Sequence, residues 1–148
     1  MAYVQTTYHL VWSTKHREPT LAAAGRPKLY AYIGGVLRKK RCKPLAIGGV
    51  ADHLHIACSI HPTVAPSNLV KDIKLATNHL IVTEGLFPGF SRWQEEYALF
   101  THHRDDRPRL IRYIEHQEAH HARGKTALAE LRRLLGEHDI PFEDRYLR

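Results

Sequence analysis

The chain of 148 residues is long enough for one compact domain, and it contains no apolar run of the roughly 18 residues that a membrane span requires. Its 22 Lys and Arg residues outnumber its 15 Asp and Glu residues, which gives a formal charge of +7 with neutral histidines. This charge favours a polyanionic partner, nucleic acid above all, although a basic surface without a partner fits it as well. We find no signal-peptide pattern and no zinc or redox spacing of the two cysteines, so we expect reduced cysteines and a cytoplasmic protein.

Strands and helices alternate along the chain. The expected elements are a strand at 3–14, a helix at 26–41, two strands within 43–60 joined near 48–52, a helix at 67–84, a strand at 92–103, and helices at 106–124 and 126–137. This order predicts an α+β fold of the ferredoxin-like split βαβ type: an antiparallel sheet with helices on one face, plus C-terminal helices. The other face of the sheet should be free. We expect a single domain over 1–148, with residues 125–148 as a C-terminal helical extension.

Two histidines, His53 and His55, stand in an otherwise apolar predicted strand. Because side chains alternate along a strand, both point to one face of the sheet, and Leu54 and Ile56 point to the other. Two imidazoles on one face can share a metal ion, but an isolated pair also fits polar residues on a solvated sheet face. Asp52 precedes the pair, and alternation directs it away from the histidines unless a turn intervenes.

The predicted helix over 106–124 carries Tyr113 and Gln117 four residues apart, so these side chains share one helix face. Leu110 and Ile114 lie close to that face, which should therefore be half-buried. The simplest interpretation is a packed tyrosine beside a glutamine without a role. A half-buried glutamine needs partners for its amide, however, and donation of its carbonyl oxygen to a metal ion would satisfy it.

Taken together, these segments resemble the single-tyrosine HUH transposases of small bacterial insertion sequences, the IS200-like transposases, including their REP-associated relatives. YHLVWSTKHR at 8–17 resembles the first strand of the family, and His53-Leu54-His55 resembles its histidine–hydrophobic–histidine motif. Residues 67–80 resemble the basic helix that follows, and RYIEHQ resembles the helix with the tyrosine and the glutamine. The ordered set spans about residues 3–122.

The resemblance implies a DNA transposase with a defined chemistry. In the family, the two histidines and the glutamine bind a divalent cation, usually Mg²⁺ or Mn²⁺, that polarises a phosphate of single-stranded DNA. The tyrosine attacks this phosphate and forms a 5′-phosphotyrosine. Carried over to this chain, the nucleophile is Tyr113 and the metal ligands are His53, His55 and Gln117. The implied partners are single-stranded DNA with hairpin ends and a second copy of the chain, with the site formed within one subunit or between two.

Further residues are assigned to DNA binding and assembly. Lys71 and Lys74 are expected to bind DNA beside the site. The aromatic segment over 92–103 predicts a homodimer, because its apolar side chains exceed what one sheet edge should expose. Several other histidines are expected at the surface or near the phosphate rather than as metal ligands: His102, His103, His116, His120 and His121.

Two other classes of function stay open. One is a non-catalytic or domesticated nucleic-acid-binding protein of the same fold. The other is a metal-dependent hydrolase that uses His53 and His55 with water and leaves Tyr113 unused.

Overall fold

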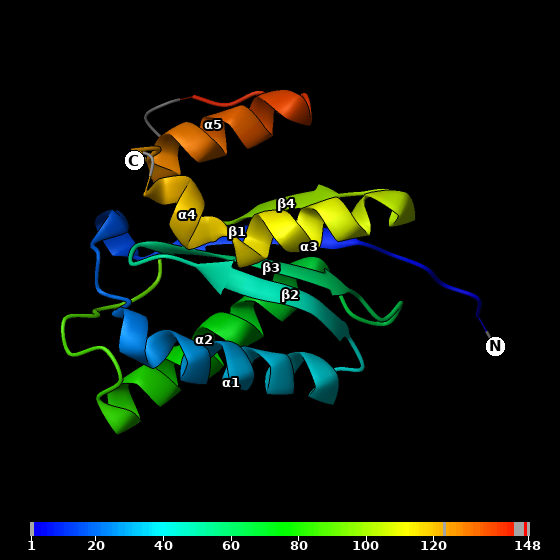
Figure 1. Cartoon of the computed structure of the whole chain (residues 1–148). Coiled ribbons are helices and arrows are strands. Elements are labelled where there is room, and N and C mark those ends of the chain that lie inside the picture. Colours follow the sequence, from blue (N-terminus) through cyan, green and yellow to red (C-terminus); the bar gives the residue numbers. More distant parts are fainter. Residues whose placement is uncertain (1, 123, 144–146, 148) are drawn as a thin grey trace.

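The computed structural model describes residues 2–122, 124–143 and 147 (Figure 1). Its centre is a four-stranded antiparallel sheet with the strand order β2-β3-β1-β4. The strands are β1 (Tyr8–Ser13), β2 (Lys43–Gly49), β3 (His53–Ser59) and β4 (Ala98–Thr101). The hairpin of β2 and β3 and the order of the strands confirm the predicted split βαβ arrangement.

Two long helices cover one face of the sheet and enclose the main core (Figure 1). They are α1 (Arg26–Lys39) and α2 (Pro66–Glu84), both predicted from their apolar spacing. Neither these helices nor the others in the described residues combine the length and apolar character needed to cross a membrane. The core that they enclose with β1 and β3 includes Leu10, Trp12, Leu29, Ile33, Leu54, Ile56, Leu69 and Ile73.

Three further helices lie on the other side of the sheet: α3 (Arg107–Glu115), α4 (Gln117–His121) and α5 (Ala127–Glu137) (Figure 1). The α+β class and the antiparallel sheet are confirmed, but the expectation of a free second face was wrong. That face carries apolar side chains, such as Val11 and Ala57, which the C-terminal helices bury. The buried residues of these two smaller clusters are Val11, Phe100, Leu134, Leu135, Ala46, Ala57, Leu110 and Ile114.

The strand predicted over 92–103 is shorter in the structure. Only its second half pairs with β1, as β4, while Trp93 forms a single bridge with Thr14. Trp93 and Phe100 are buried within the chain, and Tyr97 is 39% exposed. The apolar side chains of this segment mostly serve the protein's own core, so they do not support the homodimer that was inferred from them.

Gly48 of β2 allows α3 to lie directly on the sheet. A Cβ atom at this position would collide with the backbone carbonyl oxygen of Ile114 in α3. We expect Gly48→Ala to lower the free energy of unfolding by about 1–3 kcal/mol, the usual cost of overpacking. Gly35→Ala in α1 is the matched control, because nothing lies within 4 Å of its added Cβ. Urea unfolding followed by circular dichroism measures both variants, and a Gly48→Ala protein as stable as the wild type would contradict the close packing of α3.

Candidate functional site

The two histidines of β3 lie on the face of the sheet that α3 and α5 cover. Their neighbours Leu54 and Ile56 point into the main core, as strand alternation predicts. His53 is 1% exposed and His55 is fully buried. This burial excludes the interpretation as polar residues on a solvated sheet face, and it means that both imidazoles need partners.

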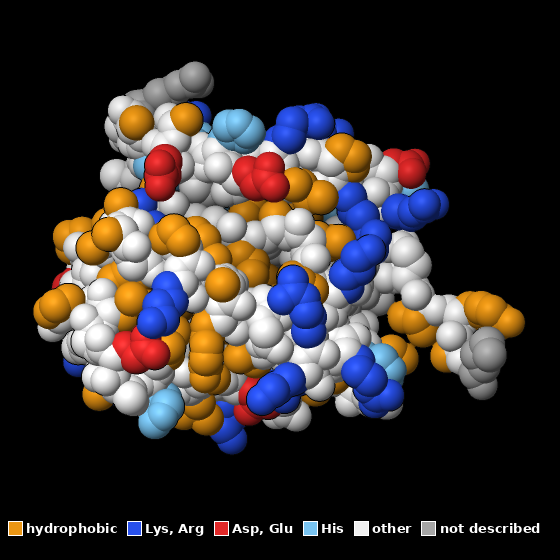
Figure 2. Space-filling model, turned by 60° about the horizontal axis from the view of Figure 1, so that its bottom comes forward, with side chains coloured by type: hydrophobic (Ala, Val, Ile, Leu, Met, Phe, Trp, Pro, Cys, Tyr) orange, Lys and Arg blue, Asp and Glu red, His pale blue; other side chains and the backbone are white. Residues whose placement is uncertain are grey.

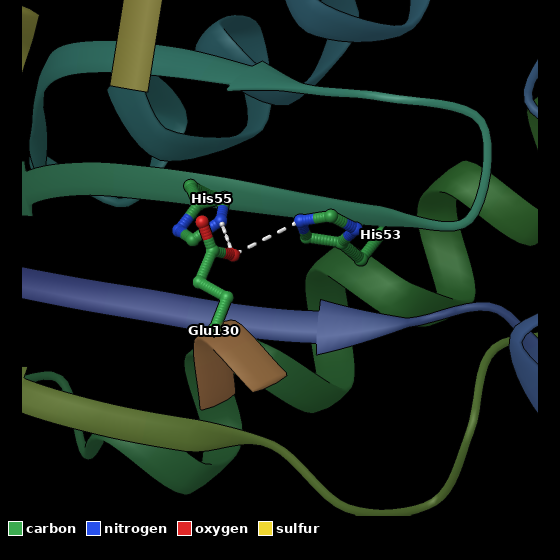
Figure 3. Close-up of side chains that lie close together, drawn as sticks. All are labelled: His53, His55 and Glu130. Carbon is green, nitrogen blue, oxygen red and sulfur yellow. Dashed lines mark hydrogen bonds and ion pairs between the residues drawn. The ribbon is translucent and has the colours of Figure 1, made fainter. Parts of the chain in front are cut away.

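A carboxylate from α5 lies between the two imidazoles (Figure 3). Glu130 Oε1 is 3.1 Å from His53 Nε2 and 2.8 Å from His55 Nε2. Glu130 is only 3% exposed, and charged side chains are almost never buried to this extent unless they are paired. The three residues form a buried group whose ligand atoms lie within 4.8 Å of one another, which is a suitable arrangement for holding a metal ion.

The second nitrogen of each imidazole also has a partner. His53 Nδ1 lies 2.7 Å from Asp52 Oδ1, and His55 Nδ1 lies 2.7 Å from His9 Nε2. Asp52 reaches His53 because it lies in the bend before β3, where the alternation of a strand does not apply. The sequence allowed this contact only if a turn preceded the strand. Partners of this kind fix the orientation of an imidazole and leave its other nitrogen for a ligand.

Burial and ion pairing have opposite effects on these groups. Burial lowers the pKa of His53, but its hydrogen bonds to Asp52 and Glu130 outweigh burial and raise this pKa to about 9. Burial prevails at His55 and lowers its pKa in spite of Glu130. At Glu130, burial raises the pKa, but the hydrogen bonds from the two histidines reverse the effect and hold it well below its usual range. The group is therefore built around a carboxylate anion whose charge is compensated by a positive His53 and by a hydrogen bond from His55.

Tyr113 and Gln117 reach the same carboxylate. The Tyr113 hydroxyl donates a short hydrogen bond to Glu130 Oε2, and Gln117 Nε2 lies 3.2 Å from that oxygen. Gln117 is 1% exposed, and its Oε1 atom lies 3.3 Å from His53 Nε2. The structure thus brings together, within one chain, the four residues that the sequence suggested as nucleophile and metal ligands.

The helix that carries Tyr113 ends earlier than predicted. α3 stops at Glu115, and α4 begins at Gln117. His116, between them, has φ −105° and ψ 24°, outside the helical region. The prediction of one continuous helix over 106–124 was therefore wrong in its middle, although the spacing of Tyr113 and Gln117 still directs both side chains to Glu130.

The Tyr113 hydroxyl lies between an anion and a cation. Arg133 Nη2 donates to it at 3.1 Å, and the guanidinium carbon is 5.5 Å from the centre of the tyrosine ring. Burial and the negative charge of Glu130 raise the pKa of Tyr113 above its usual value, against the weaker effect of Arg133. Tyr113 is therefore a protonated phenol in this arrangement. It lines a cavity of about 340 Å³ together with Arg133, His102 and Arg109.

Two histidines that were expected at the surface or near the phosphate contact the same group. His121 Nε2 lies 3.0 Å from Gln117 Oε1 and 3.3 Å from Glu130 Oε2. His120 Nε2 lies 3.4 Å from this carboxylate oxygen, so His120, His121 and Glu130 form a second group that is able to hold a metal ion. His103 and His116 are exposed, as expected.

The sequence interpretation missed Glu130, His9 and Arg133. Glu130 had a detectable signal, because it lies three residues after Ala127 and four before Leu134, on the buried face of an amphipathic helix. An acidic residue at a core position of a helix indicates a buried partner. His9 and Arg133 carry no such mark, since a strand histidine and a helix arginine are both common at surfaces.

The lysines expected to bind DNA lie on the far side of the sheet from the histidines. Lys71 and Lys74 belong to α2, whereas the histidines face α3 and α5 (Figure 1). Lys74 Nζ donates to the backbone carbonyl oxygens of residues 94–96 at 2.7–3.0 Å and so stabilises that loop. The expected position beside the site was therefore wrong. Figure 2, in which this side comes forward, shows the lysine and arginine side chains in several separate groups rather than in one patch.

A comparison with protein families decides where the chain belongs. The profile of the family described as "Transposase IS200 like" matches residues 2–117, which is more than half of the chain and includes the two strand histidines, Tyr113 and Gln117. The chain belongs to the IS200-like transposase family. The resemblance seen in the sequence is confirmed at this level.

Known relatives of this IS200-like transposase agree with the assignment. The ISDra2 transposase TnpA of Deinococcus radiodurans is 25% identical over 119 residues, which cover 76% of this chain and 84% of the relative. A crystal structure of a Deinococcus radiodurans protein named as a transposase has a TM-score of 0.61 at 23% identity, covering 79% of this chain and 95% of that one. A REP-associated tyrosine transposase bound to a REP hairpin also has a TM-score of 0.61, at 17% identity, covering 82% and 74%. The two structures share the fold.

Proposed function

We propose that this transposase cleaves and rejoins single-stranded DNA through a 5′-phosphotyrosine at Tyr113, with a divalent metal ion, Mg²⁺ or Mn²⁺, bound by His53, His55 and Gln117. One observation carries the proposal: the Tyr113 hydroxyl and both strand histidines converge on one buried carboxylate. A protein that only binds DNA gains nothing from burying such a cluster, since buried charges and imidazoles are costly unless they serve one another or a ligand.

The proposed ligands fit a divalent ion. Asp52 accepts from His53 Nδ1, so His53 Nε2 is directed at Gln117 Oε1, 3.3 Å away. Two ligand atoms bound at about 2.1 Å on neighbouring positions of an octahedral ion lie about 3.0 Å apart, close to this distance. When bound, the ion supplies Lewis-acid polarisation of the scissile phosphate.

The remaining chemistry belongs to the side chains. The Tyr113 oxygen forms a bond to phosphorus while the bond from phosphorus to the 3′ oxygen breaks. The phenol proton, which Glu130 Oε2 holds in a hydrogen bond, is released to solvent, and the departing 3′ oxygen takes up one proton from solvent and leaves as a hydroxyl, so the step neither gains nor loses a proton. Arg133 donates to the tyrosine oxygen and stabilises negative charge that develops on it. The new tyrosyl ester replaces the broken 3′ ester, so the phosphate remains a diester and rejoining by a 3′ hydroxyl needs no nucleotide cofactor.

Trapping a covalent adduct tests the proposal. The protein is incubated with Mn²⁺ and a randomised single-stranded DNA library that carries a stem–loop, and the mixture is resolved on a denaturing gel. We expect a protein band that retains labelled DNA after denaturation. Cleaved DNA without such a band would indicate a hydrolase, and intact DNA with retained binding would indicate a non-catalytic DNA-binding protein; either result would overturn the proposal.

We expect the protein to prefer a single strand with a hairpin over a blunt duplex. The charge of +7 and the hairpin bound to the REP-associated relative support this expectation. Phosphate contacts make binding weaken with salt, and each contact to a single strand adds about −0.7 to the slope of log K against log salt. Lys71 is exposed, and we expect it to bind one phosphate, so Lys71→Ala should reduce the steepness of this slope by about 0.7. Lys74 is not expected to contribute, because backbone carbonyl oxygens hold its ammonium group. Fluorescence anisotropy with unlabelled competitors measures both effects, and equal competition by a blunt duplex would refute the preference.

A homodimer remains a prediction taken from the family resemblance. Action in the cytoplasm also remains a prediction, taken from the sequence pattern and the cysteines. β4 is an edge strand of the sheet, and edge strands can pair with a second copy. The proposed site lies within one chain, so a dimer is not needed to bring Tyr113 to the histidines. Light scattering at micromolar protein should give twice the mass of the chain, and a single-chain mass would refute the dimer.

A further inference from the structure

Among the residues that the structure describes, Glu130 contacts every proposed member of the site. Its Oε1 atom faces His53 Nε2 and His55 Nε2, and its Oε2 atom faces Tyr113 and Gln117. It belongs to α5, beyond residues 2–117 that match the family profile. The proposed ligand set of two histidines and a glutamine gives this buried carboxylate no role in metal binding.

We propose that Glu130 is itself a ligand of the divalent ion, bound through Oε1, so that α5 completes the metal site of its own chain. This inference rests on the proposed function, in which His53 and His55 hold such an ion. The distances of 3.1 and 2.8 Å from Oε1 to the two imidazole nitrogens bracket the roughly 3.0 Å expected between neighbouring ligands of an octahedral ion. The three side chains come from two elements: His53 and His55 stand on β3, and Glu130 reaches them from α5 (Figure 3).

The hydrogen bonds of His53 support the presence of a cation at this point. Asp52 is a carboxylate and can only accept, so the proton of neutral His53 resides on Nδ1. The lone pair of His53 Nε2 then faces Glu130 Oε1 and Gln117 Oε1, which are acceptors as well. Three acceptors directed at one another repel unless a cation lies among them. A second proton on His53 supplies one cation, and a divalent metal ion satisfies all of the acceptors at once.

The charge of the ligands supports the same conclusion. Two neutral imidazoles and an amide oxygen leave the double charge of the ion uncompensated, whereas Mg²⁺ and Mn²⁺ favour anionic oxygen ligands. Glu130 is the buried acid in reach of both histidines within the described residues. Its second oxygen keeps the hydrogen bond from Tyr113, so the same carboxylate holds the tyrosine next to the ion.

Metal affinity tests this role without measuring cleavage. Mn²⁺ is titrated into the full chain and followed by electron paramagnetic resonance of free Mn²⁺, for the wild type, Glu130→Gln and the control Glu137→Gln. Glutamine keeps the size of the side chain but removes its charge. We expect Glu130→Gln to weaken Mn²⁺ binding by at least about tenfold, since even the loss of an outer partner of a metal ligand costs roughly 10- to 100-fold. Glu137, an exposed acid on the same helix, should have no effect.

The sign of the change separates the alternatives. If Glu130 only pairs with the histidines and competes with the metal ion for them, its removal strengthens Mn²⁺ binding. If Glu130 has no part in metal binding, the Mn²⁺ affinity is unchanged. Either result overturns the inference. If Glu130→Gln does not fold, Glu130→Asp replaces it, because aspartate keeps the negative charge but is one methylene too short to reach the ion. Weaker Mn²⁺ binding then supports the inference, and stronger or unchanged binding overturns it.

The proposed function can fail independently. In Glu130→Gln saturated with Mn²⁺, electron spin echo modulation should still show coupling to imidazole nitrogen, because His53 and His55 remain. Nitrogen coupling with unchanged affinity would remove Glu130 from the ligands and leave the histidine site intact. No nitrogen coupling in the wild-type protein would overturn the histidine site and, with it, Glu130 as its ligand.

Discussion

Tyr113→Phe is expected to abolish the covalent protein–DNA adduct and to reduce DNA cleavage by roughly 10³-fold or more, the scale seen when an enzyme loses its nucleophile. Phenylalanine retains the ring but lacks the oxygen that attacks phosphorus. The variant loses hydrogen bonds to Glu130 and Arg133, which should cost only about 1–2 kcal/mol of stability. Mn²⁺ affinity and DNA affinity should stay within about twofold of the wild type, since each hydrogen bond is worth little beside the whole interface. A labelled-DNA gel assay measures adduct and cleavage together.

Tyr97→Phe is the matched control, because Tyr97 is exposed and lies outside the cluster. It should form the adduct at the wild-type rate. An adduct in Tyr113→Phe would show that another of the seven tyrosines, or another residue, is the nucleophile. Cleavage without an adduct in that variant would instead identify a hydrolase.

The double substitution His53→Ala/His55→Ala is expected to weaken Mn²⁺ binding by more than about 100-fold, because it removes two ligands where a single outer partner is already worth roughly 10- to 100-fold. It also leaves Glu130 without the positive His53 and without its hydrogen bond to His55, and an uncompensated buried charge costs about 3–5 kcal/mol of stability. Calorimetric titration with Mn²⁺ measures the affinity, and thermal unfolding of the metal-free protein measures the stability.

His103→Ala is the control for this experiment, since His103 is exposed and pairs with exposed Asp105 rather than with Glu130. It should bind Mn²⁺ as the wild type does. Unchanged Mn²⁺ affinity in the double variant would remove His53 and His55 from the metal site, whatever the effect on stability.

The local part of the site was predictable from the sequence. Strand periodicity placed His53 and His55 on one face, and helical spacing joined Tyr113 to Gln117, because both patterns depend only on backbone geometry within a few residues. The break at His116 was not predictable, since nothing in RYIEHQ prevents a helix from continuing. The break nevertheless leaves Tyr113 and Gln117 directed at the same carboxylate.

Long-range relations were not predictable in the same way. Glu130 lies 77 residues after His53, and periodicity shows that it is on a buried helix face without showing which strand that face meets. The same limit explains the wrong position of Lys71 and Lys74: apolar spacing in α2 predicts contact with the sheet, but not with which of its two faces. The C-terminal helices cover the sheet face that had been expected to stay free.

The chemical identity of the adduct tests the phosphotyrosine mechanism directly. Protein trapped on single-stranded DNA in Mn²⁺ is digested with nuclease and protease, and the nucleotide-bearing peptide is sequenced by mass spectrometry. We expect a nucleotide 5′-phosphate on the hydroxyl of Tyr113, in a peptide that includes this residue. A phosphoryl link at any other residue, or cleaved DNA ends without a linked peptide, would contradict this mechanism.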